Sequence, residues 1–202
     1  MLRFLQSFAE KTGGSSDVIL RNGVNDPLKD EYKGFETLFN VIRYVGKDDG
    51  FNTLDGTAGY CPAQQDIWET FPDYSAYLTI EDDTEIVSDG FDDWILEALC
   101  NTPGNVGLVH LYDEAMQIVV QAFSAGWCNS LGYLCCPEVG EPAFKLSQHL
   151  GNAGGYTIDG TGGARFVHKP LLRGYGYTGN ERKGALEQGQ DHLNRFYEQE
   201  RV

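Results

Sequence analysis

Apolar positions along the chain follow helical spacing in some segments and form compact runs in others. Apolar side chains three to four residues apart predict helices over Met1–Lys11 and Phe91–Cys100, and a shorter one over Pro62–Thr70. Compact apolar runs predict five strands, over Asp17–Arg21, Asn40–Val45, Tyr74–Ile80, Val106–Leu111 and Ala164–His168. Strands separated by helices are typical of an α/β fold, here with a mostly parallel sheet flanked by helices.

Three other segments complete this outline. Val119–Gly126 fits a helix or a strand, whereas Gly151–Gly163 carries six glycines and predicts a loop or hairpin. The C-terminal tail over 180–202 is expected to be helical, because Leu193, Phe196 and Tyr197 share one face. The chain contains no internal repeat and no low-complexity linker, so we expect a single domain over 1–202.

Acidic residues close to the second long helix suggest how it begins. Asp89 is expected to cap the helix over Phe91–Cys100 through its side chain. Asp92 and Asp93 then fall in the first turn, where negative charge suits the positive end of the helix dipole.

The net charge of the chain limits the kinds of molecule that it is expected to bind. Fifteen Lys and Arg residues against thirty Asp and Glu give a net charge of −15, which argues against nucleic acid as a partner. The segment 48–144 holds eighteen of the acidic residues and no Lys or Arg. Such a segment is either a solvated, self-repelling surface or a place where cations bind.

The expected location of the protein in the cell follows from segments that the sequence does not contain. No apolar run approaches the roughly 20 residues that span a bilayer, and Met1–Leu5 does not begin a signal peptide. Five cysteines without a C-x-x-C spacing indicate buried, reduced thiols rather than a zinc site. We therefore expect a cytoplasmic protein that does not associate with membranes.

An acidic triplet ends the strand predicted over Tyr74–Ile80. Ligands of α/β sheets gather beyond the carboxyl ends of strands, which is where Glu81, Asp82 and Asp83 lie. Because side chains alternate along a strand, Glu81 and Asp83 can converge on one side. Two carboxylates there suit Mg²⁺ or Mn²⁺. An acidic surface turn explains the triplet equally well.

Other candidates carry weaker signals. Asn25 and Asp26 close the strand over Asp17–Arg21, where they suit a nucleobase or ribose, although an ordinary Asx-Pro turn accounts for them too. His168 is a candidate third metal ligand or a structural histidine. Arg165 and Lys169 suit a diphosphate, as they would also suit a solvated face.

Short motifs in a fixed order point to one family. The chain carries a first helix over Met1–Phe8, then Asp17–Tyr32, Asn52–Gly56, Tyr77–Thr84, Gly90–Trp94, Leu131–Leu134 and Phe166–His168. This ordered set covers nearly the whole chain and resembles the short GT-A glycosyltransferases of bacteriophage type. The resemblance implies a GT-A-like, Rossmann-like fold and transfer of a sugar from a nucleotide-sugar donor.

The resemblance also implies roles for particular residues. Glu81, Asp83 and His168 match the ligands of Mn²⁺ or Mg²⁺, with Asp82 beside them at the donor. Asp26 and Asn25 match the position that faces the nucleotide base, and Gly56 lies in the loop near the ribose or sugar.

An acceptor and a base complete the implied reaction. An inverting transferase needs a carboxylate to deprotonate the acceptor hydroxyl, and Glu141 and Glu138 are the candidates. The acceptor would be a glycan, a protein or a modified DNA base, in the host cytoplasm if the chain is phage-encoded. The family's first strand and its Arg-Pro turn have no counterpart ahead of Met1, so we expect either a longer natural protein or a shortened form.

The acidic composition and the absent strand leave an alternative open. A non-catalytic interaction protein, either a degenerate GT-A fold or an inhibitor that mimics DNA, would carry the same net charge of −15. Binding of a nucleotide sugar separates the two hypotheses.

Overall fold

The computed structural model describes residues 2–22, 34, 40–45, 60–80, 84–112, 118–134 and 157–168. Its contacts divide the chain into two compact units. The first draws on Met1–Asp17, Pro72–Gly132 and Leu150–Leu172, and the second on Val18–Phe71, Tyr133–His149 and Arg173–Val202. The single-domain interpretation stays a prediction, and each unit is described by itself.

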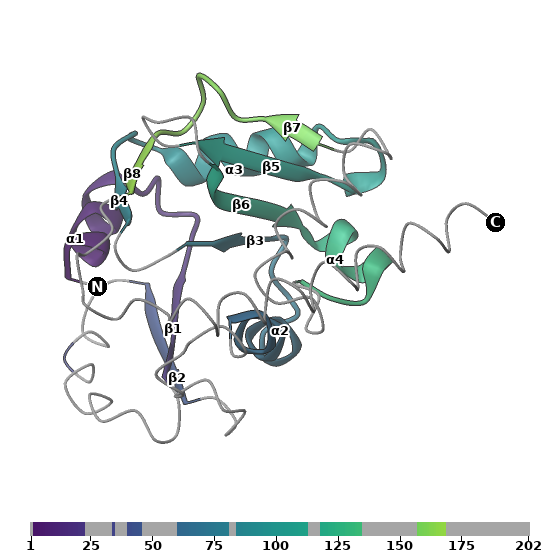
Figure 1. Ribbon diagram of the computed structural model, residues 1–202, viewed down its shortest axis with the longest axis horizontal. Helices are drawn as coiled ribbons and strands as arrows, with labels where there is room; N and C mark the ends of the chain where they lie inside the picture. Colours follow the sequence, from purple (N-terminus) through teal and green to yellow (C-terminus); the bar gives the residue numbers. More distant parts are fainter. Residues whose placement is uncertain are drawn as a thin grey trace, which may run out of the picture. The chain divides into compact units, whose positions relative to one another are not determined.

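A four-stranded sheet forms the centre of the first unit (Figure 1). Its order is β3-β6-β5-β7, and the strands are β3 (Ala76–Thr79), β6 (Ile118–Ser124), β5 (Leu108–Tyr112) and β7 (Thr157–Asp159). β6 pairs antiparallel with both β3 and β5, whereas β5 and β7 pair parallel. The strands β3, β5 and β7 therefore run in one direction, and β6 runs against them.

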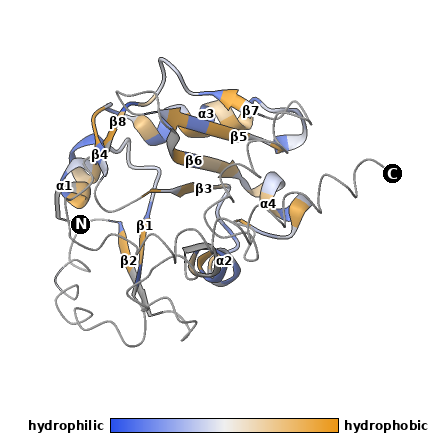
Figure 2. Ribbon diagram, viewed as in Figure 1, coloured by the Kyte–Doolittle hydropathy of each residue, from blue (hydrophilic) through white to orange (hydrophobic). Residues whose placement is uncertain are grey.

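The two central strands are buried on both faces. Leu108, Val109 and Leu111 of β5 and Val120 and Ala122 of β6 are fully buried, and Figure 2 shows both strands mostly in hydrophobic colours. The helix α3 (Phe91–Cys100) packs against β5 and β6, and Ile95 and Leu99 are among its buried residues. Apolar area removed from water in this way stabilises a fold by about 25 cal/mol per Å².

A small two-stranded ribbon stands apart from this sheet. β4 (Thr84–Ile86) pairs antiparallel with β8 (Phe166–His168). The helix α1 (Leu2–Lys11) packs against β4, where the Ile86 amide donates a hydrogen bond to Ser7 Oγ over 3.0 Å. A chain of aromatic rings joins these elements: Phe8 lies 6.0 Å from Phe91, and Phe91 lies 6.0 Å from Phe166. The ribbon is thus fixed to both helices by apolar contacts.

A polar side chain sets the boundary between β6 and the helix α4 (Ala125–Leu131). Ser124 Oγ accepts hydrogen bonds from the amides of Trp127 and Gly107, which caps the helix and ties it to the segment before β5. Gly132 ends α4 with a φ of 79°, a conformation that glycine adopts without a steric penalty. A short 3-10 helix, η2 (Pro103–Asn105), precedes β5.

The second unit contains one strand pair and one helix. β1 (Val18–Asn22) and β2 (Val41–Val45) pair parallel, with Val18 opposite Val41. The helix α2 (Tyr60–Thr70) packs against β1. Parallel pairing of two strands needs a crossover connection between them, and that connection lies outside the described residues except for Gly34 and Asn40.

The expected α/β class is confirmed, but the strands pair in both directions rather than mostly in parallel. Only five residues connect β5 to β6, from 113 to 117, and so short a link returns the chain antiparallel. The ambiguous Val119–Gly126 proves to be a strand that ends in a helix cap. The strands β4 and β7 were not predicted, and the tail over 180–202 lies outside the described residues.

The predicted cap of α3 is wrong. Gly90 occupies the N-cap position with a φ of 61°, and no side chain caps the helix. Asp89 instead accepts a hydrogen bond from Lys11 Nζ over 2.8 Å.

Among the described residues, no helix combines the length and the apolar character that crossing a bilayer requires. Of the cysteines, Cys128 is buried as expected, whereas Cys100 is exposed.

Asp92 joins the start of α3 to the loop after α1. Its carboxylate accepts hydrogen bonds from the Thr12 hydroxyl over 2.6 Å and from the Gly13 amide over 2.7 Å. Burial alone would raise the pKa of Asp92, but the hydrogen bonds from Gly13, Thr12 and Ser16 together hold that pKa below its ordinary value. The stabilising effect is therefore present above the pKa of an unfolded aspartate and is lost as the pH falls through the lower folded pKa.

We expect Asp92→Ala to lower the free energy of unfolding by about 2 kcal/mol, because it removes a charged acceptor from three donors, Thr12, Gly13 and Ser16. Asp93→Ala is the matched control, since both changes remove a charge from the first turn of α3. Asp93 is exposed and accepts a hydrogen bond from Ser15 Oγ, so we expect a loss of about 0.5 kcal/mol. Urea unfolding of both variants measures the difference, and equal losses would contradict this account.

Candidate functional site

The β4–β8 ribbon brings together two segments that the sequence analysis singled out separately. β3 ends at Thr79, the acidic triplet 81–83 follows in the sequence, and β4 begins at Thr84. In the ribbon, Thr84 and His168 are opposite one another as Cα partners. The histidine position therefore pairs with the residue that directly follows Asp83.

The ribbon is held firmly along its length. Beyond the paired residues, the Val87 amide donates to the Arg165 carbonyl over 3.0 Å, and the Arg165 amide donates to Ser88 Oγ over 2.8 Å. Ile86 and Phe166 are buried opposite one another. Because both strands are anchored in the core, the register that puts Thr84 opposite His168 is fixed by packing.

Thr84 is an unusual residue within the ribbon. Its side chain is 1% exposed, and its Oγ1 has no hydrogen-bond partner within the part of the chain that the structure describes. A buried hydroxyl without a partner costs about 1–3 kcal/mol, which makes it an exception that requires a reason.

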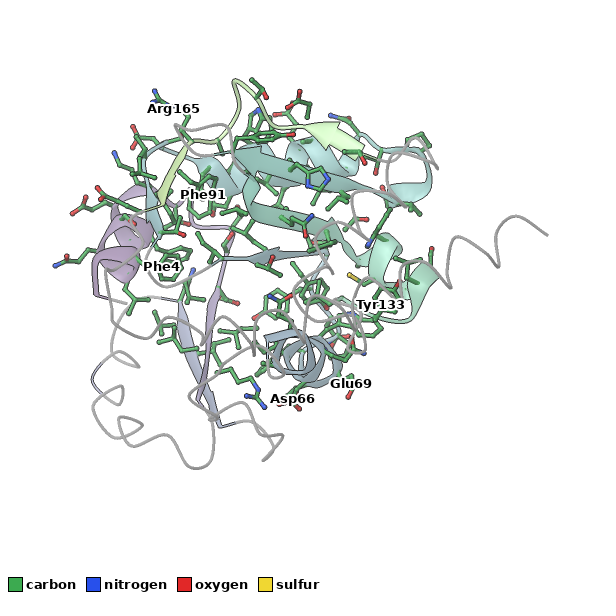
Figure 3. The ribbon with its side chains drawn as sticks, viewed as in Figure 1. Phe4, Asp66, Glu69, Phe91, Tyr133 and Arg165 are labelled. Atoms are coloured by element: carbon green, nitrogen blue, oxygen red, sulfur yellow. The ribbon has the colours of Figure 1, made fainter. Side chains whose placement is uncertain are left out.

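Arg165 lies at the far end of β8 from His168 (labelled in Figure 3). Its side chain is exposed, and it lies three positions before His168 along extended chain, a span of about 10 Å. The role of Arg165 at a diphosphate stays a prediction that depends on its long side chain reaching back along the ribbon.

The remaining predicted site residues lie outside the described part of the chain. They are Asn25, Asp26, Gly56, Glu81, Asp82, Asp83, Glu138, Glu141 and Lys169, and only the backbone of His168 is described. No cluster of three or more His, Cys, Asp or Glu side chains suited to a metal ion occurs among the described residues, a set that leaves out every predicted metal ligand.

A row of polar side chains crosses the four-stranded sheet and was missed by the sequence analysis. Thr79 pairs with Gln121, Gln121 pairs with His110, and His110 pairs with Asp159. Directly opposite residues share one face of a sheet, so the four form a continuous line through β3, β6, β5 and β7. The row reaches β3 at its last residue, two positions before Glu81.

The inner members of this row are buried. His110 is 1% exposed and Gln121 is 2% exposed, and Gln121 Nε2 lies 3.1 Å from His110 Nδ1. Burial lowers the pKa of His110 to about 4, against a smaller opposing effect of the Asp159 carboxylate. The ring is therefore neutral at pH 7.

Asp159 ends the row at the exposed edge. Its Oδ1 accepts hydrogen bonds from the hydroxyl and the amide of Thr161, which hold the pKa of Asp159 below its ordinary value.

The sequence gives a partial indication of the polar row, because His110 and Gln121 are polar residues within largely apolar strands. Their pairing requires the register of β5 and β6, which the sequence alone does not supply.

In the second unit, a buried ion pair connects β1 to α2. Arg21 Nε lies 2.9 Å from Asp66 Oδ2, and their side chains are 3% and 6% exposed. Asp66 and Glu69 lie on the same helix, as labelled in Figure 3. Arg21 is the penultimate residue of β1, so the pair fixes the end of the strand from which the segment with Asn25 and Asp26 departs.

Comparison with protein-family models, with curated proteins and with solved structures finds no significant match to this chain.

Proposed function

We propose that this chain is a metal-dependent glycosyltransferase of the GT-A type that transfers a sugar from a nucleotide donor to an acceptor. The observation that carries the proposal is the pairing of Thr84 with His168. Asp83 is bonded to Thr84, which sets their Cα atoms about 3.8 Å apart. Opposite Cα atoms of an antiparallel pair are about 5 Å apart. The Cα atoms of Asp83 and His168 are then separated by at most about 9 Å, a distance that two side chains can bridge at one ion.

The chemistry of these groups fits the metal. Carboxylate oxygens with one imidazole suit Mn²⁺ and Mg²⁺. The buried hydroxyl of Thr84, which has no hydrogen-bond partner among the described residues, adds a polar atom next to the triplet in the sequence. We propose Glu81, Asp83 and His168 as ligands, with Asp82 at the donor; a divalent metal there neutralises charge on a departing nucleoside diphosphate.

The proposed reaction also assigns roles to the chain's other candidates. Asn25 and Asp26 hydrogen-bond the base of the donor, and Gly56 lets the backbone approach the ribose or sugar. Arg165 and Lys169 bind the diphosphate oxygens. Glu141 or Glu138 takes the proton of the acceptor hydroxyl.

The order and direction of the strands support the proposal as well. β3, β5 and β7 run in one direction, and the acidic triplet follows the carboxyl end of β3, where α/β sheets bind their ligands. The polar row ends at the same point of β3.

Thermal unfolding with nucleotides tests the proposal. The full chain is heated with UDP, GDP, ADP, TDP or CDP, each with Mn²⁺ and again with EDTA. A ligand at 100 times its dissociation constant stabilises the folded state by about 2.7 kcal/mol, which shifts the melting temperature of a chain of this size by about 5–10 °C. We expect such a shift with one nucleotide, only in the presence of Mn²⁺.

Asp83→Ala should abolish the Mn²⁺-dependent shift, because it removes one proposed ligand. Asp73→Ala is the matched control: Asp73 is an exposed aspartate just before β3 and lies outside the triplet, so the shift should remain. If no nucleotide shifts the melting temperature of the unmodified chain, the transferase proposal fails and a non-catalytic acidic interaction protein is favoured.

A further inference from the structure

Two buried polar atoms on one face of the four-stranded sheet have no hydrogen-bond partner among the described residues. They are His110 Nε2 on β5 and Thr157 Oγ1 on β7. His110 is 1% exposed, whereas Thr157 is half-buried with its hydroxyl oxygen shielded from water. Buried polar groups in folded proteins almost always have a partner, either in the protein or in an ordered water molecule.

The pairing of β5 with β7 brings these two atoms to the same place. Thr157 is opposite Leu108, and His110 is two positions further along β5 on the same face. Diagonal neighbours of this kind are about 7–8 Å apart, within the reach of an aromatic ring. The hydroxyl of Thr84 differs, because no other such atom occurs among the described side chains of its ribbon. The combination of two atoms, rather than either alone, indicates a binding site.

The hydrogen bond on the other edge of the imidazole directs Nε2 towards β7. His110 Nδ1 lies 3.1 Å from Gln121 Nε2, and Gln121 is opposite His110 on β6. β5 lies between β6 and β7 (Figure 1). The two nitrogens occupy opposite edges of the ring, so Nε2 is on the edge away from β6. Because Nδ1 accepts from the Gln121 amide, Nε2 carries the ring proton and is a donor.

The carboxylate of Asp159 supplies a third polar group beside this donor. Asp159 is opposite His110, and its negative charge opposes the lowering of the histidine pKa. Its Oδ1 accepts hydrogen bonds from Thr161, and a carboxylate offers further acceptor positions. A donor, a hydroxyl and an acceptor are the partners of an internal water, which typically makes about three hydrogen bonds to buried polar groups.

We propose that one ordered water molecule binds between His110 and Thr157, where it accepts the Nε2 proton and hydrogen-bonds Thr157 Oγ1. Two hydrogen bonds of about 2.8–3.0 Å let a water join atoms that are up to about 6 Å apart. The water extends the polar row to a second residue of the edge strand β7, and it satisfies the buried donor of the histidine. The site lies within the sheet and does not depend on the transferase proposal.

Oxygen-17 relaxation dispersion of the full chain tests the site, because it counts long-lived internal waters without a contribution from hydroxyl protons. Thr157→Val replaces the hydroxyl with an isosteric methyl group and should hold one internal water fewer than the unmodified chain. Thr79→Val is the matched control. Thr79 is a buried threonine at the other end of the row, and its hydroxyl donates to the Gln121 carbonyl. Its variant should keep the full number of internal waters.

The melting temperature of Thr157→Val distinguishes a bridged hydroxyl from an unpartnered one by the sign of the change. The variant should melt about 2–4 °C lower than the unmodified chain, because the water loses a partner. Removal of an unpartnered hydroxyl would instead raise the melting temperature. In the His110→Gln background the ring donor is already gone, so the same substitution should have little or no destabilising effect.

Three results would overturn the water site. The first is an equal number of long-lived waters in Thr157→Val and the unmodified chain. The second is a higher melting temperature for Thr157→Val. The third is an equal fall in melting temperature in the unmodified and His110→Gln backgrounds, which would show that His110 and Thr157 act independently. The oxygen-17 measurement on the unmodified chain needs no variant, and the absence of any long-lived water there would also refute the site.

Discussion

Replacing Asp66 with alanine is expected to lower the free energy of unfolding by about 3–5 kcal/mol, the usual result of removing one partner from a buried ion pair. Arg21 Nε and Asp66 Oδ2 are 2.9 Å apart, and both side chains are almost completely buried. The variant removes the Asp66 carboxylate from a guanidinium that is shielded from water. Much of the loss is the cost of a buried charge that is less well compensated, rather than the strength of the pair itself.

A double variant provides the control. Arg21→Met combined with Asp66→Leu removes both charges and keeps apolar side chains of similar length, so it should recover most of the lost stability. Equilibrium unfolding in urea gives the two free energies. If the double variant is as unstable as Asp66→Ala, packing around α2 rather than the buried charge explains the loss.

The same pair affects the proposed donor site. Arg21 and Asp66 fix the last residues of β1, and the segment that carries Asn25 and Asp26 follows directly in the sequence. Asp66→Asn retains one hydrogen-bond acceptor and should fold, but it loosens this end of the strand. The nucleotide-dependent rise in melting temperature is therefore expected to be smaller in Asp66→Asn than in the unmodified chain.

Elements with strong local signals were predicted closely. α3 matches its predicted range, because apolar residues recur at helical spacing and two acids stand in its first turn. β5 and β6 were recognisable as apolar runs, although an apolar run of eight residues also fits a helix. Ser124 resolved that ambiguity, since its hydroxyl caps α4 and ends the strand there.

Elements that depend on distant partners were missed. β4 and β7 have three residues each, too few for any periodic pattern, and each exists because a remote strand pairs with it. β7 pairs with β5 at a close approach, as a Cβ on Gly160 would collide with the carbonyl oxygen of His110. The glycines of this segment predicted a loop or a hairpin, whereas here one of them permits a strand to lie beside another.

The candidate site likewise has features that the sequence reveals and features that only the folded structure reveals. The acidic triplet and His168 were found as separate signals, because residue type and strand ends are visible in a sequence. That His168 is opposite the residue after the triplet depends on the pairing of β4 with β8, which is a property of the folded chain. That the Thr84 hydroxyl is buried and has no partner within the described part of the chain likewise requires the structure.

Acidification should destabilise the protein through His110. Gln121 Nε2 donates to His110 Nδ1, so the proton of the neutral ring resides on Nε2. A second proton would put an N–H at Nδ1, directly facing the amide N–H of Gln121. Burial lowers the pKa of His110 to about 4, whereas an unfolded histidine has a pKa of about 6.5.

The sign of the effect follows from these two values. Above pH 6.5 the ring is neutral in both states, and its contribution to stability is fully present. As the pH falls from 6.5 towards 4, the unfolded chain binds a proton that the folded chain rejects, so stability is lost. The loss amounts to about 1.4 kcal/mol per pH unit, and to about 3 kcal/mol over the whole interval.

The matched variant is His110→Gln, which does not titrate and still offers an oxygen to the Gln121 amide. Urea unfolding between pH 7 and pH 4.5 should show a steeper loss of stability for the unmodified chain, by close to one proton. Asp159 is the charged group that faces His110 from β7, and its carboxylate opposes the lowering of the histidine pKa. Asp159→Asn should therefore deepen the loss slightly. If the pH profiles of the unmodified chain and His110→Gln are parallel, the folded protein accepts a proton on His110 by rearranging or hydrating the polar row. The buried neutral histidine would then not make stability depend on pH.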